Sequence, residues 1–275
     1  MSVIVADQLA EQAELFWKQG YLVLPNMLTK NEIDAINAVI ERSQQEEPHI
    51  WANLSESFRQ SVDILKSRPE FDPFIENPNT LPLLRKIMGE DITFEELYVM
   101  LRDPIESLKE IKGWHRDLTR NYDRRYEIQP ISLVYYLSDV SATDHCFSIV
   151  PETHARLIDM HPRDVQEADT VDINGPAGTA VVFHARCIHN GKLKPHSRQR
   201  RTLHMYFSKD DGVRTSEWDE IPARLHTKTD PSLPSRLYSK WNVTTVFKGT
   251  GMKPKMASTA TAEELIREAE NAEKR

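Results

Sequence analysis

Residues 131–140 read ISLVYYLSDV, a run of β-branched and aromatic residues that ends beside an Asp and is typical of a β-strand. Similar runs lie on both sides of it and are separated by Asp, Asn, Gly and Pro. They are ITFEELYVMLR (92–102), CFSIVP (146–151), TAVVFHARCIH (179–189) and RTLHMYFSK (201–209). The long helical crossovers that parallel strands need do not separate these runs. The pattern predicts a mainly β (α+β) protein with an antiparallel sandwich or jelly roll over about residues 92–208.

The segment before the β-rich region has helical periodicity. Residues 7–19 carry apolar side chains at helical spacing, and Gly20 suits the end of that helix. A short β-rich run, YLVLP, follows. Thr29 and Glu32 then form a capping-box pattern that predicts the start of a second helix. The N-terminal order is therefore helix, strand, helix, and we expect these helices to pack outside the β core.

Three further segments are less regular. A third helix is predicted near residues 82–88, ended by Gly89. The preceding polar stretch with scattered aromatic residues, 48–80, gives no clear assignment. Residues 211–240 mix Pro, Asp, Ser and Arg, which favours a long surface excursion or a lid.

Length and composition fit one catalytic domain. The chain has 275 residues, of which 39% are hydrophobic, and this is enough to bury a sizeable core. We expect a single domain over residues 1–248. Residues 249–275 are expected to form a C-terminal linker and a polar helix, because a capping-box pattern precedes ELIREAENAEKR.

Charge and cysteine content exclude several classes of protein. The net charge is −7, so no overall attraction to nucleic acid or to an anionic membrane is expected. The first residues lack the pattern of a secretory signal, and no apolar run approaches the roughly 20 residues that span a bilayer. We expect a cytoplasmic protein with a small-molecule partner and with reduced thiols at Cys146 and Cys187, its two cysteines. The oligomeric state stays open.

The segment Gly113-Trp-His-Arg-Asp117-Leu predicts a metal site. Residues two apart on an extended backbone point the same way, so His115 and Asp117 can converge on one point. His189, at the end of the run 179–189, is the candidate third ligand. Two histidines and one carboxylate with open positions beside them form the ligand set of non-haem Fe(II) oxygenases.

An arginine after the distal histidine predicts a second anchoring point. Arg200 follows His189 by eleven residues and opens the next β run. A guanidinium at that place is suited to a bidentate grip on a dicarboxylate. Arg201 is adjacent, and spacing favours Arg200.

Several motifs in order resemble the phytanoyl-CoA dioxygenase-like family of Fe(II)/2-oxoglutarate oxygenases. The resemblance runs from about residue 12 to residue 208. Its motifs are FWKQGYLVLPNMLTKNEI, GWHRDL, ISLVYYLSDV, FSIVPETH, GTAVVFHARCIHNG and RQRRTLHMYF. The agreement of several ordered motifs is far more specific than the pair His115 and Asp117 alone.

The resemblance implies a fold, a set of cofactors and a reaction. The fold would be a double-stranded β-helix, a cupin-like jelly roll, with helices outside. His115, Asp117 and His189 would hold Fe(II), and Arg200 would bind the distal carboxylate of 2-oxoglutarate, the cosubstrate used with O2. Hydroxylation is favoured over halogenation, because halogenating relatives generally have a small residue in place of Asp117.

The chain departs from the family at Gly191, where relatives often have a Ser that helps to hold 2-oxoglutarate. We expect Thr202 or a tyrosine such as Tyr135 to supply that contact. The turn Asp144-His-Cys146 stands where relatives commonly have a small, Gly-containing turn, which bears on the shape of that loop.

Basic residues flank both metal motifs in this acidic protein. They predict a small anionic substrate, such as an organophosphonate or an amino acid, held beside a pocket wall at Trp114. The candidate substrate-binding residues are Trp114, Arg116, Arg120, Arg124 and Arg186. Three alternatives stay open: oxidation of an apolar metabolite or acyl compound, a cupin-like metalloenzyme that does not use 2-oxoglutarate, and a non-catalytic binding protein on the same scaffold.

Overall fold

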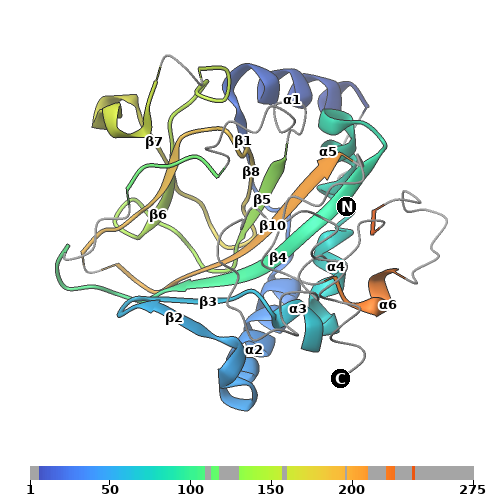
Figure 1. The fold of residues 1–275 in the computed structure, drawn as a ribbon, viewed down its shortest axis with the longest axis vertical. Coiled ribbons are helices and arrows are strands. Elements are labelled where there is room, and N and C mark those ends of the chain that lie inside the picture. Colours follow the sequence, from blue (N-terminus) through green and yellow to red (C-terminus); the bar gives the residue numbers. More distant parts are fainter. Residues whose placement is uncertain are drawn as a thin grey trace, which may run out of the picture.

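The computed structural model of this chain describes residues 6–108, 113–117, 130–156, 160–195, 197–209, 221–226 and 237–238. Two antiparallel sheets form its core (Figure 1). The larger sheet has seven strands in the order β1-β8-β5-β10-β4-β3-β2, and the smaller sheet has three in the order β7-β6-β9. This is the predicted jelly-roll arrangement, a double-stranded β-helix.

The strand bounds agree with the β-rich runs of the sequence. The larger sheet is built from β1 (Tyr21–Leu24), β2 (Ala52–Ser55), β3 (Phe58–Ser61), β4 (Ile92–Arg102), β5 (Ile131–Tyr136), β8 (Ala180–His184) and β10 (Arg200–Lys209). The smaller sheet is built from β6 (Cys146–Ile149), β7 (Val171–Ile173) and β9 (His189–Lys192).

Alternation along the strands divides the core into two layers. On β5, Leu133 and Tyr135 join the large apolar cluster on the helix side, whereas Val134 and Tyr136 join a second cluster that also contains residues of β6 and β7. The second cluster therefore lies between the two sheets, in the interior of the β-helix. Side chains two apart on a strand share a face, so this division decides which residues can reach the site.

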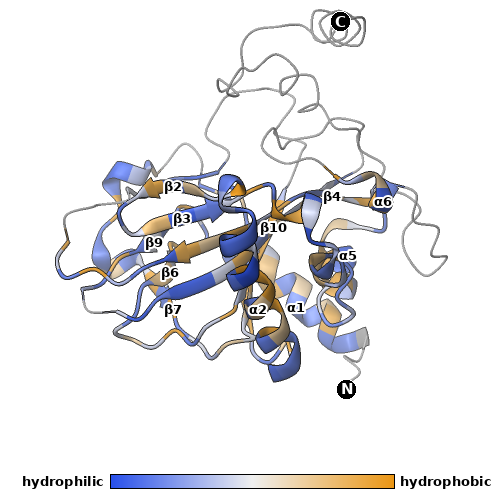
Figure 2. Cartoon of the chain, turned by 90° about the horizontal axis from the view of Figure 1, so that it is seen from below, coloured by the Kyte–Doolittle hydropathy of each residue, from blue (hydrophilic) through white to orange (hydrophobic). Residues whose placement is uncertain are grey.

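Helices cover the outer face of the larger sheet, as predicted. They are α1 (Ala6–Gln19), α2 (Lys30–Glu46), α3 (Ile64–Ser67), α4 (Asp72–Ile75), α5 (Leu81–Met88) and α6 (Ala223–His226). In Figure 1, α3 to α6 lie on one side of β4, and β6 and β7 lie on the far side of the larger sheet. Figure 2 shows both hydrophilic and hydrophobic residues along α2, as expected of a helix with one face against a core.

The helix ends follow the signals in the sequence. The side chain of Thr29 accepts a hydrogen bond from the backbone of Glu32, and the side chain of Glu32 accepts one from the backbone of Thr29, so the predicted capping box begins α2. Gly20, after α1, has φ 85°, and a Cβ there would collide with Cys187 and His154. Glycine is therefore required where α1 turns into β1.

The stretch that the sequence left unassigned forms a hairpin and short helices. Strands β2 and β3 pair with each other, and β3 pairs with β4, so the hairpin extends the larger sheet at one edge. Short 3-10 turns at Pro48–Ile50 and Pro69–Phe71 flank this hairpin and α3. Two more such turns, Pro162–Asp164 and Glu167–Asp169, precede β7.

Two described segments beyond β10 return to the core. Leu225 on α6 and Leu237 are each 1% exposed, and the amide of Phe94 donates to the carbonyl of Leu237 at 2.8 Å. The rest of the predicted excursion 211–240 and the predicted tail 249–275 lie outside the described residues. In the part of the chain that the structure describes, no helix has the length and apolar character needed to cross a membrane.

Candidate active site

His115 and His189 are brought together by the main chain. They form an isolated antiparallel β-bridge in which each amide donates to the other residue's carbonyl, at 3.1 and 2.9 Å. Their ring centroids are 4.4 Å apart. Each Nδ1 faces a carbonyl two residues earlier, that of Gly113 at 3.1 Å and that of Cys187 at 3.0 Å. A proton on Nδ1 then leaves each Nε2 with a free lone pair for a metal.

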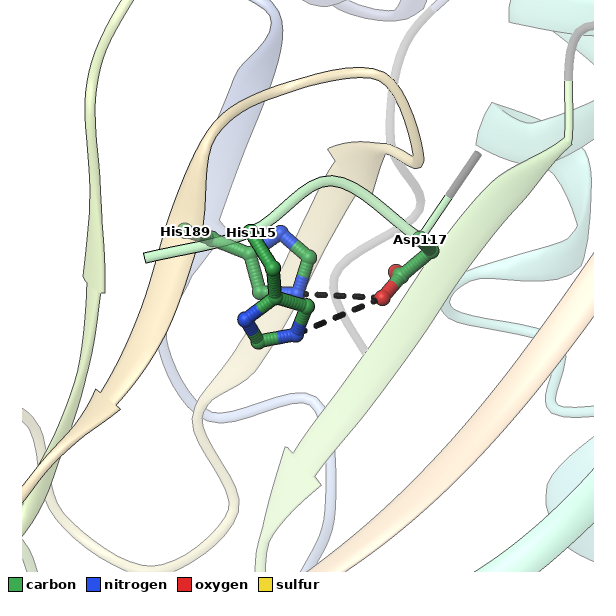
Figure 3. Close-up of side chains that lie close together, drawn as sticks. All are labelled: His115, Asp117 and His189. Atoms are coloured by element: carbon green, nitrogen blue, oxygen red, sulfur yellow. Dashed lines mark ion pairs between the residues drawn. The ribbon is translucent and has the colours of Figure 1, made fainter. Parts of the chain in front are cut away.

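Asp117 supplies the carboxylate between the two rings. Its amide donates to the carbonyl of Ala185 at 3.0 Å, which fixes it beside the end of β8. Its Oδ1 lies 3.3 Å from Nε2 of His189 and 3.7 Å from Nε2 of His115 (Figure 3). The three candidate ligand atoms all lie within 4.8 Å of one another. One divalent cation can contact all three, so the residues fit the expected iron.

The electrostatics of Asp117 favour the charged form. Burial by itself raises the pKa of a carboxyl group, but the charges of His189 and His115 and hydrogen bonds from His189 and Tyr206 outweigh it and lower the pKa of Asp117 to about 2. An ionised carboxylate beside two imidazoles is the form that binds a metal.

Tyr206 fixes the other carboxylate oxygen. Its hydroxyl donates to Oδ2 of Asp117 at 2.6 Å, while Oδ1 faces the histidines. Burial and the charge of Asp117 raise the pKa of Tyr206 well above its usual value, so the phenol keeps its proton and remains a donor. The sequence reasoning missed this residue. Period-2 alternation could have found it, because placing Arg200 in the interior places Tyr206 there as well.

Arg200 is buried with part of its guanidinium unsatisfied. The residue is 7% exposed, and its Nε and Nη1 have no hydrogen-bond partner among the described residues. A buried charged group without partners is strongly unfavourable unless a ligand satisfies it. A Cβ added at Gly191 would lie 3.6 Å from Nη2 of Arg200, and Gly191 follows His189 by two residues on β9. The guanidinium therefore lies about 7 Å along that strand from the candidate metal ligand His189, a span suited to a five-carbon dicarboxylate.

Arg201 has the opposite surroundings. Its guanidinium donates to Glu41 at 3.0 Å and to Gln199 at 2.7 Å, on the helix side of the sheet. Of the two neighbouring arginines, only Arg200 is directed into the interior.

Thr202 and Tyr135, the two residues predicted to make the auxiliary contact with 2-oxoglutarate, lie on different faces of the larger sheet. Thr202 lies on the same face of β10 as Arg200, and its hydroxyl pairs with Nε2 of His204 at 2.9 Å. Tyr135 requires a correction, because it points to the helix side, where its hydroxyl pairs with Thr80 at 2.7 Å. Its neighbour Tyr136 is the interior tyrosine and lies close enough to Arg200 for their charges to interact.

Arg116 has a structural role, which corrects its assignment as a substrate-binding residue. It is 7% exposed, and its guanidinium donates to the carbonyls of Thr153 (2.6 Å), Arg156 (3.1 Å), Met160 (2.9 Å) and, by a short contact, Arg186. These bonds connect the metal-binding segment to the loops around it. They leave the guanidinium committed to backbone oxygens.

Of the other candidate substrate-binding residues, the structure describes Arg186 and Trp114. The charge of Arg186 acts on His154 and His184, on the side of β8 that faces α1. Trp114 is half-buried. Arg120 and Arg124 lie outside the described residues.

A cavity of about 580 Å³ adjoins the metal site, with Asp117 in its wall. One side is formed by the segment around the β2–β3 hairpin, including Trp51 and Gln60, and the other by Glu96, Tyr98 and Tyr206. Glu96 and Tyr206 are directly opposed on β4 and β10. This wall of the cavity was not predicted from the sequence, because the residues of the β2–β3 hairpin show no strong strand pattern.

Comparisons with known proteins agree with this geometry. The curated protein ectoine dioxygenase of Stutzerimonas stutzeri (strain A1501) is 23% identical over 248 residues, which cover 78% of this chain and 81% of that protein. The solved structure of the epimerase SnoN with Fe3+, alpha ketoglutarate and nogalamycin RO has a TM-score of 0.63 at 17% identity, and the match covers 82% of this chain and 94% of that one. HygX from Streptomyces hygroscopicus, with nickel, 2-oxoglutarate and hygromycin B bound, has a TM-score of 0.59 at 17% identity and 83% and 95% coverage.

A jelly-roll core with two histidines and one carboxylate at its mouth is the arrangement of a non-haem iron oxygenase. The sequence model of the family described as phytanoyl-CoA dioxygenase (PhyH) matches residues 16–202, more than half of the chain. The protein belongs to this family and is a non-haem iron, 2-oxoglutarate-dependent dioxygenase.

Proposed function

We propose that this protein hydroxylates an unactivated C–H bond of a small molecule with Fe(II), 2-oxoglutarate and O2. In the balanced reaction, R–H, O2 and 2-oxoglutarate give R–OH, succinate and CO2. One oxygen atom enters the product and the other enters succinate. The bound iron and cosubstrate supply the activation of O2, which the side chains of the protein cannot provide.

The observation that carries this proposal is the pairing of a metal triad with an unsatisfied buried arginine. His115, Asp117 and His189 would hold the iron. Arg200, with Nε and Nη1 lacking partners in the described chain, would bind the distal carboxylate of 2-oxoglutarate by charge-assisted hydrogen bonds. A metalloenzyme that does not use 2-oxoglutarate would have no need of this buried charge.

Other residues would position the ligands and exclude water. Tyr206 holds Oδ2 of Asp117, so only Oδ1 faces the histidine nitrogens. The rings of Phe147 and Phe183 lie 5.3 and 4.8 Å from the ring of His189, centroid to centroid, and shield it from solvent. A carboxylate at position 117 fills the place that a halide would require, which favours hydroxylation.

The substrate would bind in the cavity beside Asp117. The predicted small anionic substrate, for example an organophosphonate or an amino acid, now depends on Arg120 and Arg124, since Arg116 and Arg186 are engaged elsewhere. That substrate class stays a prediction.

Succinate formation from 2-oxoglutarate tests the proposal. The purified protein with Fe(II), O2 and 2-oxoglutarate should form succinate, and His189→Ala should abolish both this turnover and Fe(II) binding measured by anaerobic calorimetry. The matched control is His161→Ala, an exposed histidine outside the triad, which should retain both. Succinate formation at the wild-type rate by His189→Ala would refute the assignment.

A further inference from the structure

The cavity beside the metal site has room for more than a compact substrate. Its volume of about 580 Å³ falls in the range of roughly 300–1,000 Å³ that binds drug-sized molecules. Apolar side chains of Ile50, Leu54 and Val62 line it around the β2–β3 hairpin, and Pro130 and Ala185 line it near the end of β8. No Lys or Arg is present among the described residues of this wall. The lining therefore favours a mainly apolar ligand.

Most polar side chains of this wall already have partners within the protein. Asp117 belongs to the metal triad and accepts a hydrogen bond from Tyr206. The indole N–H of Trp51 donates to a serine of α2 at 3.2 Å. Asp63 forms an ion pair with a lysine at 3.4 Å, and Glu96 also interacts with other groups of the protein. These groups are satisfied before any substrate binds.

Gln60 is a polar side chain of the wall with a different status. It is half-buried, and it makes no hydrogen bond to any other residue that the structure describes. Its amide offers an acceptor oxygen and two donor hydrogens but no charge. A charged group that leaves water needs a charged partner, whereas a hydroxyl, carbonyl or amide needs only a hydrogen bond. The amide of Gln60 is therefore suited to a neutral polar group.

Strand pairing places Gln60 on the same side of the larger sheet as the metal site. Gln60 is directly opposite Met100 on β4, and Met100 is directly opposite Thr202 on β10. Directly opposed residues share a face of the sheet, and so do residues four apart on one strand. Tyr206, which donates to Asp117, lies four residues after Thr202 and hence on this face as well.

The same register gives the distance that a substrate must span. Four residues along β10 correspond to about 13 Å, and β3 lies two strands from β10, which adds about 10 Å at right angles. The backbones of Gln60 and Tyr206 are thus roughly 16 Å apart, and side chains directed into the cavity shorten the gap to on the order of 10 Å. A compact amino acid or a short phosphonate does not reach from one end to the other.

We propose that the substrate is an uncharged, mainly apolar molecule with the length of two linked rings. Gln60 binds a hydroxyl, carbonyl or amide group at the end far from the iron, and the carbon that is oxidised lies at the other end. This inference rests on the proposed hydroxylation and adds the substrate class. Gln60 is then a specificity-determining residue, because its hydrogen bond forms only when the far end carries such a group.

Binding of three probes tests the substrate class. The probes are 4-phenylcyclohexanol, cyclohexanol and 4-phenylcyclohexanecarboxylate, titrated under anaerobic conditions into the protein loaded with Fe(II) and 2-oxoglutarate. We expect the two-ring alcohol to bind at least about tenfold more tightly than cyclohexanol, because the second ring buries further apolar surface, and more tightly than the carboxylate. Undetectable binding of the two-ring alcohol, equal affinity for the two alcohols, or tighter binding of the carboxylate overturns the proposal.

A pair of variants tests the role of Gln60. Gln60→Leu replaces the amide by a hydrocarbon of similar size and should weaken binding of 4-phenylcyclohexanol about 2- to 10-fold, with unchanged affinity for 2-oxoglutarate. Gln45→Leu, at an exposed glutamine of α2, should keep both affinities. Unchanged binding of the alcohol by folded Gln60→Leu, or weaker binding of 2-oxoglutarate, overturns the assignment of Gln60 to the substrate. If Gln60→Leu does not fold, the three probes on the wild-type protein still decide the substrate class.

The two proposals fail in different ways. Absence of succinate formation from 2-oxoglutarate refutes the oxygenase reaction. Succinate formation together with tighter binding of the carboxylate probe leaves the reaction in place and refutes only the uncharged substrate.

Discussion

At the scale of single residues, Arg200 and Arg201 have different hydrogen-bond partners, although they are neighbours in the chain. Arg200→Ala should raise the KM for 2-oxoglutarate by roughly 10- to 100-fold, because hydrogen bonds between charged groups contribute about 1.5–3 kcal/mol. Arg201→Ala should leave this KM unchanged, since that guanidinium is bonded to Glu41 and Gln199. Succinate formation across a range of 2-oxoglutarate concentrations measures both. The opposite result would show that the interior face of β10 has been assigned wrongly.

Tyr206 should act on iron affinity through Asp117. Removing a residue that orients a metal ligand typically weakens metal binding by about 10- to 100-fold. Tyr206→Phe deletes the 2.6 Å bond to Oδ2 of Asp117, and anaerobic titration with Fe(II) should show a loss in that range. Tyr135→Phe is the matched control. It removes a bond to Thr80 on the helix side and should reduce stability by about 1 kcal/mol without changing iron affinity.

The clustering of His115, Asp117 and His189 was predictable from the sequence, whereas the choice between two tyrosines was not. His115 and Asp117 are two apart, and extended backbone places such residues on one side whatever the surrounding fold. Tyr135 and Tyr136 are adjacent in β5, a strand in which all six residues are buried. A strand covered on both faces has no polar alternation to show which side is the interior.

At the scale of secondary-structure elements, the start of β10 is held by Asp144. This carboxylate accepts a hydrogen bond from the guanidinium of Arg198 at 2.7 Å and another from the backbone amide of Arg198 at 2.9 Å. The hydrogen bond from Arg198 is the main cause that holds the pKa of Asp144 well below its usual value. The loop Asp144-His-Cys146 departs from the family pattern in the sequence. It contains Asp144, the residue that anchors the strand carrying Arg200.

This anchor should make stability depend on pH. The pKa of Asp144 in the folded chain is lower than the value of about 3.9 expected in an unfolded chain. The bond therefore stabilises the fold above about pH 4 and is lost as the pH falls further. Asp144→Asn should reduce the free energy of unfolding at pH 7 by about 1–3 kcal/mol, with a smaller loss at pH 3. Urea unfolding at both pH values measures this.

The control for that experiment is Asp34→Asn. Asp34 forms an exposed pair with Lys30, with side-chain exposures of 61% and 83%, and such pairs contribute little. A loss for Asp144→Asn no larger than for Asp34→Asn at pH 7 would contradict the role of the anchor.

Elements whose signals lie close together in the sequence could be predicted, whereas elements that depend on distant partners could not. The start of α2 is encoded by Thr29 and Glu32, four residues in all from the first to the last, and both sides of the capping box form. The hairpin β2–β3 consists of two four-residue strands and depends on pairing with β4, which lies more than thirty residues further along the chain. No local pattern encodes such a partner, so this wall of the cavity emerged only from the three-dimensional structure.

At the scale of the whole molecule, the β-helix is completed by segments that follow it. Leu225, Leu237 and Tyr238 belong to the main apolar cluster, and the hydroxyl of Tyr238 donates to Glu76 at 2.6 Å. The guanidinium of Arg224 is bonded to Asp72 at 2.7 Å. These contacts place Arg224, Leu225, Leu237 and Tyr238 in the folding unit, and its end at about residue 248 stays a prediction.

Truncation tests that boundary. A chain ending at residue 248 should retain the Tm of the full chain. A chain ending at residue 220 loses the burial of four large side chains, those of Ile221, Leu225, Leu237 and Tyr238. It should lose at least about 6 kcal/mol of stability, because each contributes roughly 1.5–3 kcal/mol. Thermal unfolding followed by circular dichroism measures both. A chain ending at residue 220 with unchanged Tm would place the boundary earlier.

The bridge between His115 and His189 also determines when entropy is lost. The two residues are 74 positions apart in the chain, and closing such a loop costs roughly (3/2)RT ln 74, about 4 kcal/mol, plus a constant. Two backbone hydrogen bonds hold the closed loop as part of the β-structure. Loop closure is thus a cost of folding, and the free energy of iron binding is not reduced by it.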